Sequence, residues 1–294
     1  MPHTLAALNA ASDEDFAAEL GPVFENAPWI AEAAATSRPF GTIRDLFGAM
    51  RAVVERADVE TRLALLRGHP ELAGRAARSG RMTADSVAEQ GGAGLDALSD
   101  AEYARFDAMN VAYRDRFGLP FILCVRRHGR ASLLRTFEKR LANDVATEKA
   151  AAEAEMFRIA AIRVGNLVTG DGALATTGRI STHVLDIVRG RPAAGVAIEL
   201  FEVVSPTETR LVARTATNAE GRTDAPLIGG VPIPIATYEL RFELGEYHRR
   251  EGVELAEPPF LDVVPVRFGV AEPEAHYHVP LVATPWSFGT YRGS

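Results

Sequence analysis

The sequence predicts a protein of two domains, an N-terminal all-α helical bundle followed by a C-terminal all-β sandwich. Its 294 residues exceed the usual size of a single domain. The first half is rich in alanine and runs in helical periods, whereas short β-rich runs separated by turn residues follow Gly178. A Gly- and Thr-rich stretch without helical period separates the two patterns. We therefore assign residues 1–165 to the helical domain, 166–178 to a linker and 179–294 to the sandwich.

The composition is that of a globular protein, with 47% apolar and 24% charged residues. The net charge of -7 offers no basic surface, so we expect no nucleic-acid partner. No apolar run reaches the roughly 18 residues of a membrane span, and the N-terminus lacks the layout of a signal peptide. The single cysteine excludes an internal disulfide and fits a reducing compartment. We expect a cytoplasmic protein, with a peroxisomal location by an unrecognised internal signal as the alternative.

The clearest helix of the first half is predicted between Ser99 and Phe117. A capping box of Ser99 and Glu102 marks its start, and Gly118 and Pro120 mark its end. The apolar stripe of this helix is interrupted by one amide. The stripe consists of Tyr103, Phe106, Asn110, Tyr113 and Phe117. A buried amide needs a hydrogen-bond partner, and a neighbouring helix is the expected one.

A second helix, over about 143–165, aligns Met156, Ala160 and Arg163 on one face. Arg163 would then point inward. A buried guanidinium is costly unless it meets an anion, so this residue either pairs with a core carboxylate or anchors an acidic ligand.

Irregular segments before and between these helices carry further candidate residues. His69 precedes a proline, which places it on extended backbone in a loop. A lone histidine is more often structural than catalytic, but this one is followed by a polar Glu89-Gln90 pair and a Gly-rich loop that either approaches a ligand or forms an ordinary turn. Cys124 lies in an apolar run and is expected to pack in the core.

Taken in order, these segments resemble 2-oxo-4-hydroxy-4-carboxy-5-ureidoimidazoline (OHCU) decarboxylase, which releases CO2 in urate breakdown to give (S)-allantoin. The resemblance rests on Pro28-Trp29-Ile30, His69-Pro-Glu-Leu-Ala-Gly, Ser86-x-x-Glu-Gln90, Asn110-x-x-Tyr113, Phe117-Gly-x-Pro-Phe-Ile122 and Phe137-x-x-Arg140-Leu141. These motifs occur in the same order and with the same spacing as in the decarboxylase family, over nearly the whole first half. The resemblance is therefore specific.

The resemblance implies a catalytic site in the helical domain. His69 delivers the proton that replaces CO2, as a loop histidine titrating near neutrality can. Glu89 and Gln90 orient the substrate through hydrogen bonds, and Arg163 contacts it. The remaining residues implied to line the pocket are Pro70, Ser86, Val87, Ala88, Phe121, Ile122, Leu123, Cys124 and Val125. No metal or organic cofactor is implied, because the neighbouring carbonyl and imine of the substrate can hold the negative charge.

The second half predicts a sandwich of short strands. The strands are expected at residues 180–187, 196–204, 210–217, 237–244, 263–268 and 277–282. Strand alternation places His276 and His278 on one face, and it places His183 on the same face as Ser181. By itself, His183 is more consistent with a solvated or hydrogen-bonded histidine than with a catalytic one. Arg222 lies in a polar turn, where arginine is normally solvated.

These segments resemble 5-hydroxyisourate hydrolase, an enzyme of the transthyretin-like fold. The resemblance rests on Ser181-Thr-His-Val-Leu-Asp186, Gly190-x-Pro192, Asn218-x-x-Gly-Arg-Thr-Asp224, Tyr238-x-Leu-x-Phe242, His276-Tyr-His-Val-Pro-Leu281 and Tyr291-Arg-Gly-Ser294. The ending Tyr-Arg-Gly-Ser distinguishes the hydrolase from the transthyretin hormone carrier of the same fold. The domain is therefore expected to be a transthyretin-like sandwich.

The second resemblance implies a hydrolytic site that opens a ring amide. His183 or His278 activates water, Arg222 stabilises the developing charge, and Tyr291 and Ser294 position the substrate. A zinc site built on the histidines is the less favoured alternative, since the family implies no metal. The resemblance also implies a homo-oligomer assembled through the transthyretin-like domain.

Together the two resemblances predict a bifunctional enzyme that acts on small purine-derived substrates. The C-terminal domain would hydrolyse 5-hydroxyisourate to OHCU, and the N-terminal domain would decarboxylate OHCU to (S)-allantoin. Two alternatives remain at this point. One is an enzyme with a single active domain, and the other is a transthyretin-like protein that binds a small ligand in the sandwich.

Overall fold

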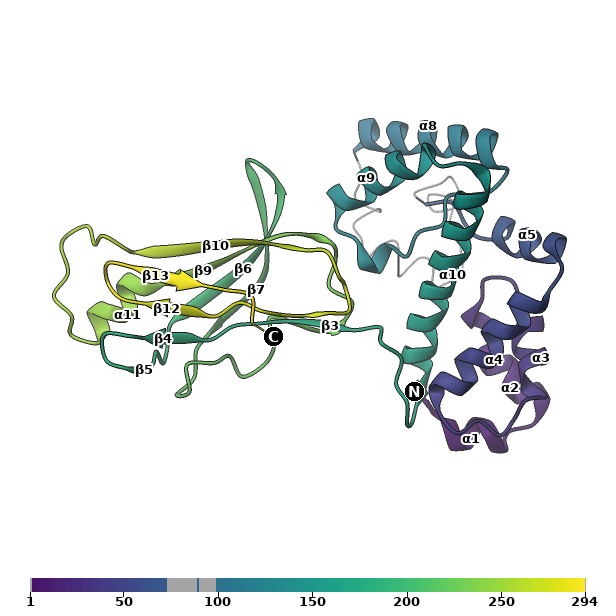
Figure 1. Ribbon diagram of the computed structural model, residues 1–294, viewed down its shortest axis with the longest axis horizontal. Helices are drawn as coiled ribbons and strands as arrows, with labels where there is room; N and C mark the ends of the chain where they lie inside the picture. The colour runs from purple at the N-terminus through teal and green to yellow at the C-terminus, as the bar shows by residue number, and fades with distance from the viewer. Residues whose placement is uncertain (1, 73–88, 90–98, 294) are drawn as a thin grey trace. The chain divides into compact units, whose positions relative to one another are not determined.

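The computed structural model describes residues 2–72, 89 and 99–293, and the chain forms two compact units (Figure 1). One unit comprises residues 1–126 and 133–176, and the other comprises residues 127–132 and 177–294. Each unit has its own apolar core. Helices dominate the first unit and strands the second, which confirms the predicted fold class. The finer boundaries, with a linker at residues 166–178, stay a prediction. Among the described helices, none is long and apolar enough to cross a membrane.

Most of the described helices of the first unit begin after a residue whose side chain caps them, although α3 begins after Pro28 without such a cap. Those described are α1 (Leu5–Ala10), α2 (Asp13–Leu20), α3 (Trp29–Ala35), α4 (Ile43–Arg56), α5 (Val59–Arg67), α8 (Asp100–Phe117), α9 (Arg130–Leu141) and α10 (Val145–Leu167). Short 3-10 turns, η1 (Gly21–Val23) and η3 (Val125–Arg127), and a parallel pair of two-residue strands, β1 (His3–Thr4) and β2 (Val168–Thr169), complete this part of the chain. Six helices start after a Ser, Thr or Asp whose side chain accepts a backbone N–H, and each such cap stabilises a helix by about 1 kcal/mol.

Helix α8 has the predicted limits. Ser99 and Glu102 form the capping box, and Gly118 ends the helix in the left-handed region at φ +67°. The amide of Asn110 is buried, as expected, but its partner is not another helix: Nδ2 donates to the carbonyl oxygen of Leu72, at 2.9 Å. Asn110 therefore fixes the loop that follows His69.

A buried ionic network fixes the segment after α8. Glu148, which has no exposed surface, accepts hydrogen bonds from the Arg140 guanidinium and from Tyr113. Arg140 also donates to the carbonyl oxygen of Ile122, at 2.6 Å. Removing one member of such a buried pair leaves an uncompensated charge, which typically costs 3–5 kcal/mol. The motif residues Tyr113 and Arg140 thus hold the pocket wall in place.

The second unit is a sandwich of antiparallel and parallel strands. One sheet has the order β10-β9-β6-β7, and the other strands form the orders β11-β3-β8 and β13-β12-β4-β5. Their bounds are β3 Gly178–Ser181, β4 Val184–Asp186, β5 Arg191–Pro192, β6 Ala197–Ser205, β7 Glu208–Ala216, β8 Ile228–Val231, β9 Ala236–Glu243, β10 Val263–Val270, β11 His276–His278, β12 Leu281–Ala283 and β13 Phe288–Thr290. Alternate residues of β6 and β9, such as Leu200 and Leu240, fill the core.

Two of the predicted strands are interrupted, and the interruptions position the polar residues. The run 180–187 divides into β3 and β4, and the run 277–282 divides into β11 and β12. The two runs pair with each other in parallel. Strand β11 pairs with β3, with His278 opposite Ser181, and β12 pairs with β4, with Leu281 opposite Val184. The short helix α11 (Leu244–Arg250) was not predicted, because no side chain caps its start.

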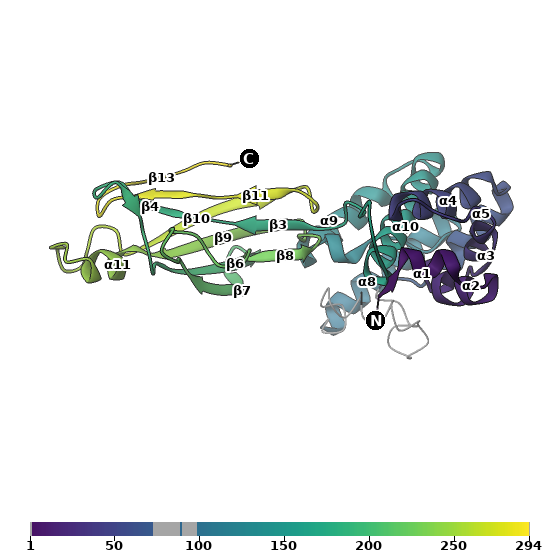
Figure 2. The same ribbon diagram turned by 90° about the horizontal axis from the view of Figure 1, so that it is seen from below.

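The segment after β12 is held against the sheet. Strand β13 pairs with β12, and the backbone N–H of Gly293 donates to the carbonyl oxygen of His278, at 2.8 Å, so that the chain runs alongside β11 (Figure 2). The Arg292 guanidinium lies over the Tyr277 ring. The side chains of Trp286 and Tyr291 nevertheless remain about 60% exposed.

Candidate active sites

Three histidines of the second unit form a continuous hydrogen-bonded cluster. His183 Nδ1 lies 2.8 Å from His278 Nε2, and the other nitrogen of that ring, His278 Nδ1, lies 2.9 Å from Ser181 Oγ. Ser181 Oγ is also 2.7 Å from His276 Nε2, and His276 Nδ1 is 3.2 Å from a guanidinium nitrogen of Arg179. Within the described residues, Nε2 of His183 is the one nitrogen of these rings without a hydrogen bond.

The surroundings lower the pKa of all three imidazoles and so favour their neutral forms. Burial lowers the pKa of His183, and the charge of Arg222 lowers it further. Burial also lowers the pKa of His278, with the neighbouring His183, Arg222 and His276 acting in the same direction. A neutral imidazole can accept a proton, so this cluster contains a base at neutral pH.

Arg222 reaches the cluster because of the turn that precedes it. Its backbone forms a β-bridge with His183, and its N–H donates to Asn218 Oδ1, at 3.1 Å. Gly221 adopts φ +69°, and a Cβ there would meet the carbonyl oxygen of Val184 at 2.5 Å. The tight turn therefore requires glycine, and it places an exposed cation beside the histidines.

A cavity of about 320 Å³ adjoins this cluster. It is lined by Arg179, Ser181, Thr182, Arg222, Thr223, Asp224, Ala225, Pro226, His276 and His278. His183 does not line it directly but binds His278, which does. Tyr291 is exposed and does not line it either, and Ser294 lies outside the described residues.

The histidine spacing does not fit a zinc site. The rings hydrogen-bond to one another and to Ser181, whereas zinc ligands converge on a common point about 2 Å from each nitrogen. Within residues 2–72, 89 and 99–293, no group of three His, Cys, Asp or Glu side chains is arranged to hold a metal ion.

The first unit holds a second polar cluster around Arg163. The guanidinium binds both carboxylate oxygens of Glu89 at 3.0 Å and one oxygen of Glu25 at 3.1 Å. Burial alone would lower the pKa of Arg163, but the two carboxylates outweigh it and raise the value. Of the two interpretations of this inward arginine, pairing with core carboxylates is the one that the structure describes.

His69 lies next to this ionic cluster. Its Nδ1 atom is buried without a hydrogen-bond partner among the described residues. Burial lowers the pKa of His69, and the charge of Arg163 lowers it further. The charge of Glu25 acts in the opposite direction but is outweighed, so the pKa is about 4. The expectation of a loop histidine that titrates near neutrality is therefore wrong, because the ring is desolvated.

A cavity of about 30 Å³ connects these residues, which is room for one or two water molecules. It is lined by His69, Pro70, Leu72, Glu89, Phe121, Ile122, Leu123, Val125, Ile159 and Arg163. Cys124 is buried beside it without lining it, and its backbone N–H donates to Glu155, at 2.9 Å. Four predicted pocket residues, Ser86, Val87, Ala88 and Gln90, lie outside the described residues.

Comparisons with known proteins identify both units. Residues 9–165 match the family model of OHCU decarboxylase. Residues 180–293 match that of the HIUase/Transthyretin family, in which HIUase stands for 5-hydroxyisourate hydrolase. The chain belongs to both families. It is 53% identical over 115 residues to a 5-hydroxyisourate hydrolase of Deinococcus radiodurans, which covers 39% of this chain and 95% of the relative. It is 38% identical over 161 residues to a 2-oxo-4-hydroxy-4-carboxy-5-ureidoimidazoline decarboxylase of Haloferax volcanii, with 55% and 94% covered.

The full length of the chain is similar to a solved structure as well. A crystal structure of (S)-allantoin synthase matches it with 33% identity and a TM-score of 0.56, and the match covers 100% of both chains. The order of the two domains, with the OHCU decarboxylase first and the HIUase/transthyretin domain second, is thereby confirmed.

Sequence reasoning missed several members of both sites. In the decarboxylase domain, Glu25 pairs with Arg163 from 138 residues away, and no local pattern indicates such a contact. In the HIUase domain, Ser181 was placed on the face of His183 by strand alternation, but its bonds to two histidines depend on parallel pairing with β11. Arg179 was not singled out, although the same alternation puts it two residues from Ser181 on that face.

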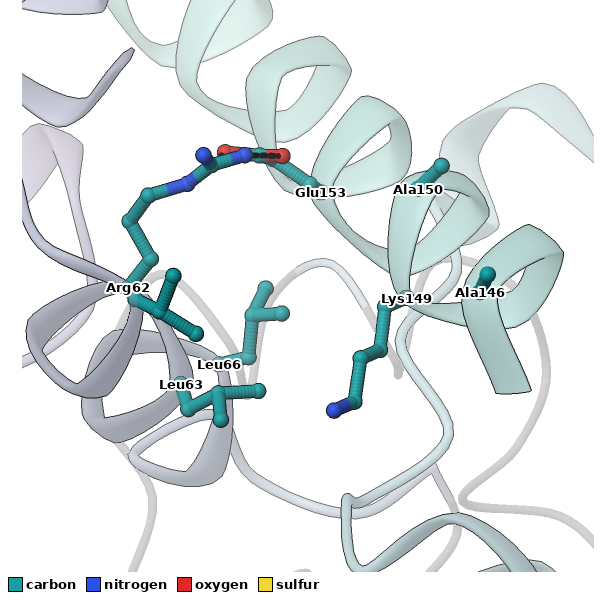
Figure 3. Close-up of a pocket in the computed structure, with 8 residues that line it drawn as sticks. Arg62, Leu63, Leu66, Ala146, Lys149, Ala150 and Glu153 are labelled. Atoms are coloured by element: carbon teal, nitrogen blue, oxygen red, sulfur yellow. Dashed lines mark hydrogen bonds and ion pairs between the residues drawn. The ribbon is translucent and has the colours of Figure 1, made fainter. Parts of the chain in front are cut away.

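A third cavity, of about 280 Å³, lies between α5 and α10 of the decarboxylase domain (Figure 3). Its floor is apolar, with Leu63 and Leu66, and the Arg62–Glu153 ion pair closes one side. It shares no residue with the cavity at His69.

Proposed function

We propose that this chain is a bifunctional enzyme of urate degradation. The HIUase domain hydrolyses 5-hydroxyisourate to OHCU, and the decarboxylase domain converts OHCU to (S)-allantoin. The observation that supports this most directly is the presence of a polar cluster in each unit, at His183–His278 and at His69–Glu89. A carrier of apolar ligands would not need the neutral bases and the adjacent cation of the sandwich.

The product assay tests this function. Freshly prepared 5-hydroxyisourate is given to the full-length chain while absorbance and circular dichroism are recorded. Loss of substrate faster than its spontaneous decay, followed by the circular dichroism of a single allantoin enantiomer, is the expected result. Substrate loss without optically active allantoin would mean that only the hydrolase domain is active, and no acceleration would contradict the proposal.

For ring opening, we assign water activation to His183. The sequence left His183 and His278 as alternatives, but both ring nitrogens of His278 are already hydrogen-bonded, whereas Nε2 of His183 is free among the described residues. Water attacks the carbonyl carbon, and its proton passes to His183 Nε2. Arg222 stabilises the oxyanion, and the proton goes to the ring nitrogen as the C–N bond breaks. We keep Tyr291 and Ser294 as proposed substrate-positioning residues.

For decarboxylation, we assign the final proton transfer to His69. The electron pair of the bond to CO2 moves into the adjacent C=N group of the substrate, and the carbon skeleton then takes a proton on one face. Burial lowers the pKa of His69 to about 4 and so favours the neutral ring. The carboxylate of the bound substrate favours the charged imidazolium, so the ring takes up a proton as the substrate binds.

Arg163 has a positioning role in this proposal. Its bidentate pair holds the carboxylate of Glu89 toward the cavity, where it can accept hydrogen bonds from the ureido and ring N–H groups. Arg163 itself lines the cavity, so we also keep the predicted direct contact between Arg163 and the substrate as a proposal. Gln90, Ser86 and the segment 121–125 remain proposed substrate contacts.

The pH dependence of ring opening is expected to respond to Arg222. Because the Arg222 charge lowers the pKa of His183 and of His278, its removal raises both. The base is active when neutral, so kcat/KM falls as pH decreases through this pKa. In Arg222→Gln the acid limb should therefore move to higher pH, in addition to any loss of rate. An acid limb at the wild-type pH in this variant would contradict the proposed coupling.

The turn at Gly221 offers a matched pair of variants. Gly221→Ala is expected to slow ring opening about 10- to 100-fold, because the added Cβ displaces Arg222 and His183 from each other. Gly190 has a similar φ of +64° but open space around it, so Gly190→Ala introduces the same backbone strain without the clash. Initial rates of 5-hydroxyisourate loss should separate the two. Equal rates would show that the turn does not position the site.

We also propose a homo-oligomer that assembles through the HIUase domain, in the cytoplasm. Exposed aromatic side chains support the assembly, with Trp286 62%, Phe288 43% and Tyr291 60% exposed. Light scattering coupled to gel filtration should give a mass that is a multiple of 31.7 kDa. A monomeric mass would contradict the assembly.

A further inference from the structure

Ser181 occupies the centre of the histidine cluster and is not assigned a role in the reaction above. Its Oγ atom lies 2.7 Å from His276 Nε2 and 2.9 Å from His278 Nδ1, and the residue lines the cavity of about 320 Å³. A hydroxyl group has one proton to donate and two lone pairs to accept with. Where that proton points depends on the protonation of the two imidazoles.

Arg179 determines the protonation of His276. The guanidinium nitrogen 3.2 Å from His276 Nδ1 has only protons to offer, so Nδ1 accepts that bond. Burial and the Arg179 charge lower the pKa of His276, which favours the neutral ring. The single ring proton then sits on Nε2 and is donated to Ser181. His276 therefore cannot accept the hydroxyl proton.

The base role of His183 determines the protonation of His278. This inference rests on the proposed function, in which His183 Nε2 receives the proton of water. That nitrogen must carry a lone pair, so the ring proton of His183 is on Nδ1 and is donated to His278 Nε2. The proton of neutral His278 is then on Nδ1, which donates to Ser181.

The Ser181 hydroxyl thus accepts one hydrogen bond from His276 and one from His278. Neither imidazole can accept the proton of the Ser181 hydroxyl in return. We propose that the Ser181 hydroxyl donates its proton into the cavity, to a carbonyl oxygen of the cyclic amide substrate. Ser181 is then a further catalytic residue, which adds to Arg222 in stabilising the developing oxyanion. Arg179 and His276 are positioning residues, since they keep the hydroxyl proton available.

The expected effects follow from this arrangement. Ser181→Ala removes the donor and should lower kcat of ring opening about 100-fold with little change in KM, as for the loss of one oxyanion donor. Ser181→Thr keeps the hydroxyl and should restore most of the rate. Arg179→Met allows His276 to take the hydroxyl proton and should lower kcat about tenfold, whereas Arg179→Lys keeps a donor-only cation and should resemble the wild type.

A double-mutant cycle gives the decisive test. If Arg179 acts through Ser181, the variant carrying both Arg179→Met and Ser181→Ala should be no slower than Ser181→Ala alone. The inference would be overturned if the fold decrease in kcat of the double variant equalled the product of the two single decreases. A Ser181→Ala rate within twofold of wild type would overturn it as well. Decarboxylation of supplied OHCU by the same full-length variants shows that the decarboxylase domain is unaffected, and their thermal unfolding, compared with that of the wild type, serves as the folding control for the sandwich. Failure of the wild-type chain itself to open 5-hydroxyisourate would instead contradict the proposed function.

Discussion

Replacing His69 with alanine is expected to leave ring opening intact and to let OHCU accumulate. The variant lacks the group that protonates the carbon after CO2 leaves, and general acid catalysis of this kind contributes about 10²- to 10⁴-fold. Started from 5-hydroxyisourate, the reaction should therefore stop at the optically active intermediate, and the allantoin that forms slowly should lack the circular dichroism of a single enantiomer. The time courses of absorbance and circular dichroism measure both effects.

A matched control for this variant is His3→Ala. His3 belongs to the same unit and pairs with Glu19 at a partly exposed position, so its loss removes a histidine without touching the cavity at His69. Decarboxylation at the wild-type rate is expected for this control. A His69→Ala variant that turns over OHCU as fast as the control would remove His69 from the mechanism.

Replacing His183 with alanine is expected to have the opposite effect. Ring opening should slow about 10²- to 10⁴-fold because the free imidazole nitrogen is lost, while supplied OHCU should be decarboxylated at the wild-type rate. Unchanged decarboxylation shows that the loss is confined to the HIUase domain, and thermal unfolding of the variant, compared with the wild type, shows whether that domain is folded. The measurement is the initial rate of 5-hydroxyisourate loss, corrected for its spontaneous decay.

His278→Ala distinguishes the two histidines of the pair. His183 keeps its free nitrogen in this variant and loses only the partner that orients it, so the rate should fall less than in His183→Ala. The reverse order, with His278→Ala the slower enzyme, would transfer water activation to His278.

Features governed by neighbouring residues were predictable from the sequence. The limits of α8 follow from Ser99, Glu102 and Gly118, which act within one turn of the helix ends. The shared face of His276 and His278 follows from strand alternation, with the intervening Tyr277 buried as expected.

Features that depend on distant parts of the chain were not predictable in the same way. The amide of Asn110 binds a loop carbonyl rather than a helix, and the guanidinium of Arg163 meets Glu25 as well as Glu89. The low pKa of His69 likewise reflects desolvation, which a sequence motif does not contain. The motifs thus located the candidate residues, whereas their charges and partners required the packed structure.

The parallel pairing of β3 with β11 has a consequence for synthesis of the chain. His278 follows His183 by 95 residues in the sequence, so the hydrolase cluster cannot form until nearly the whole sandwich has left the ribosome. The residues described around His69, in contrast, are all present once Arg163 has been added. If the domains fold in the order of their synthesis, the activity that consumes the unstable intermediate is in place before the activity that produces it.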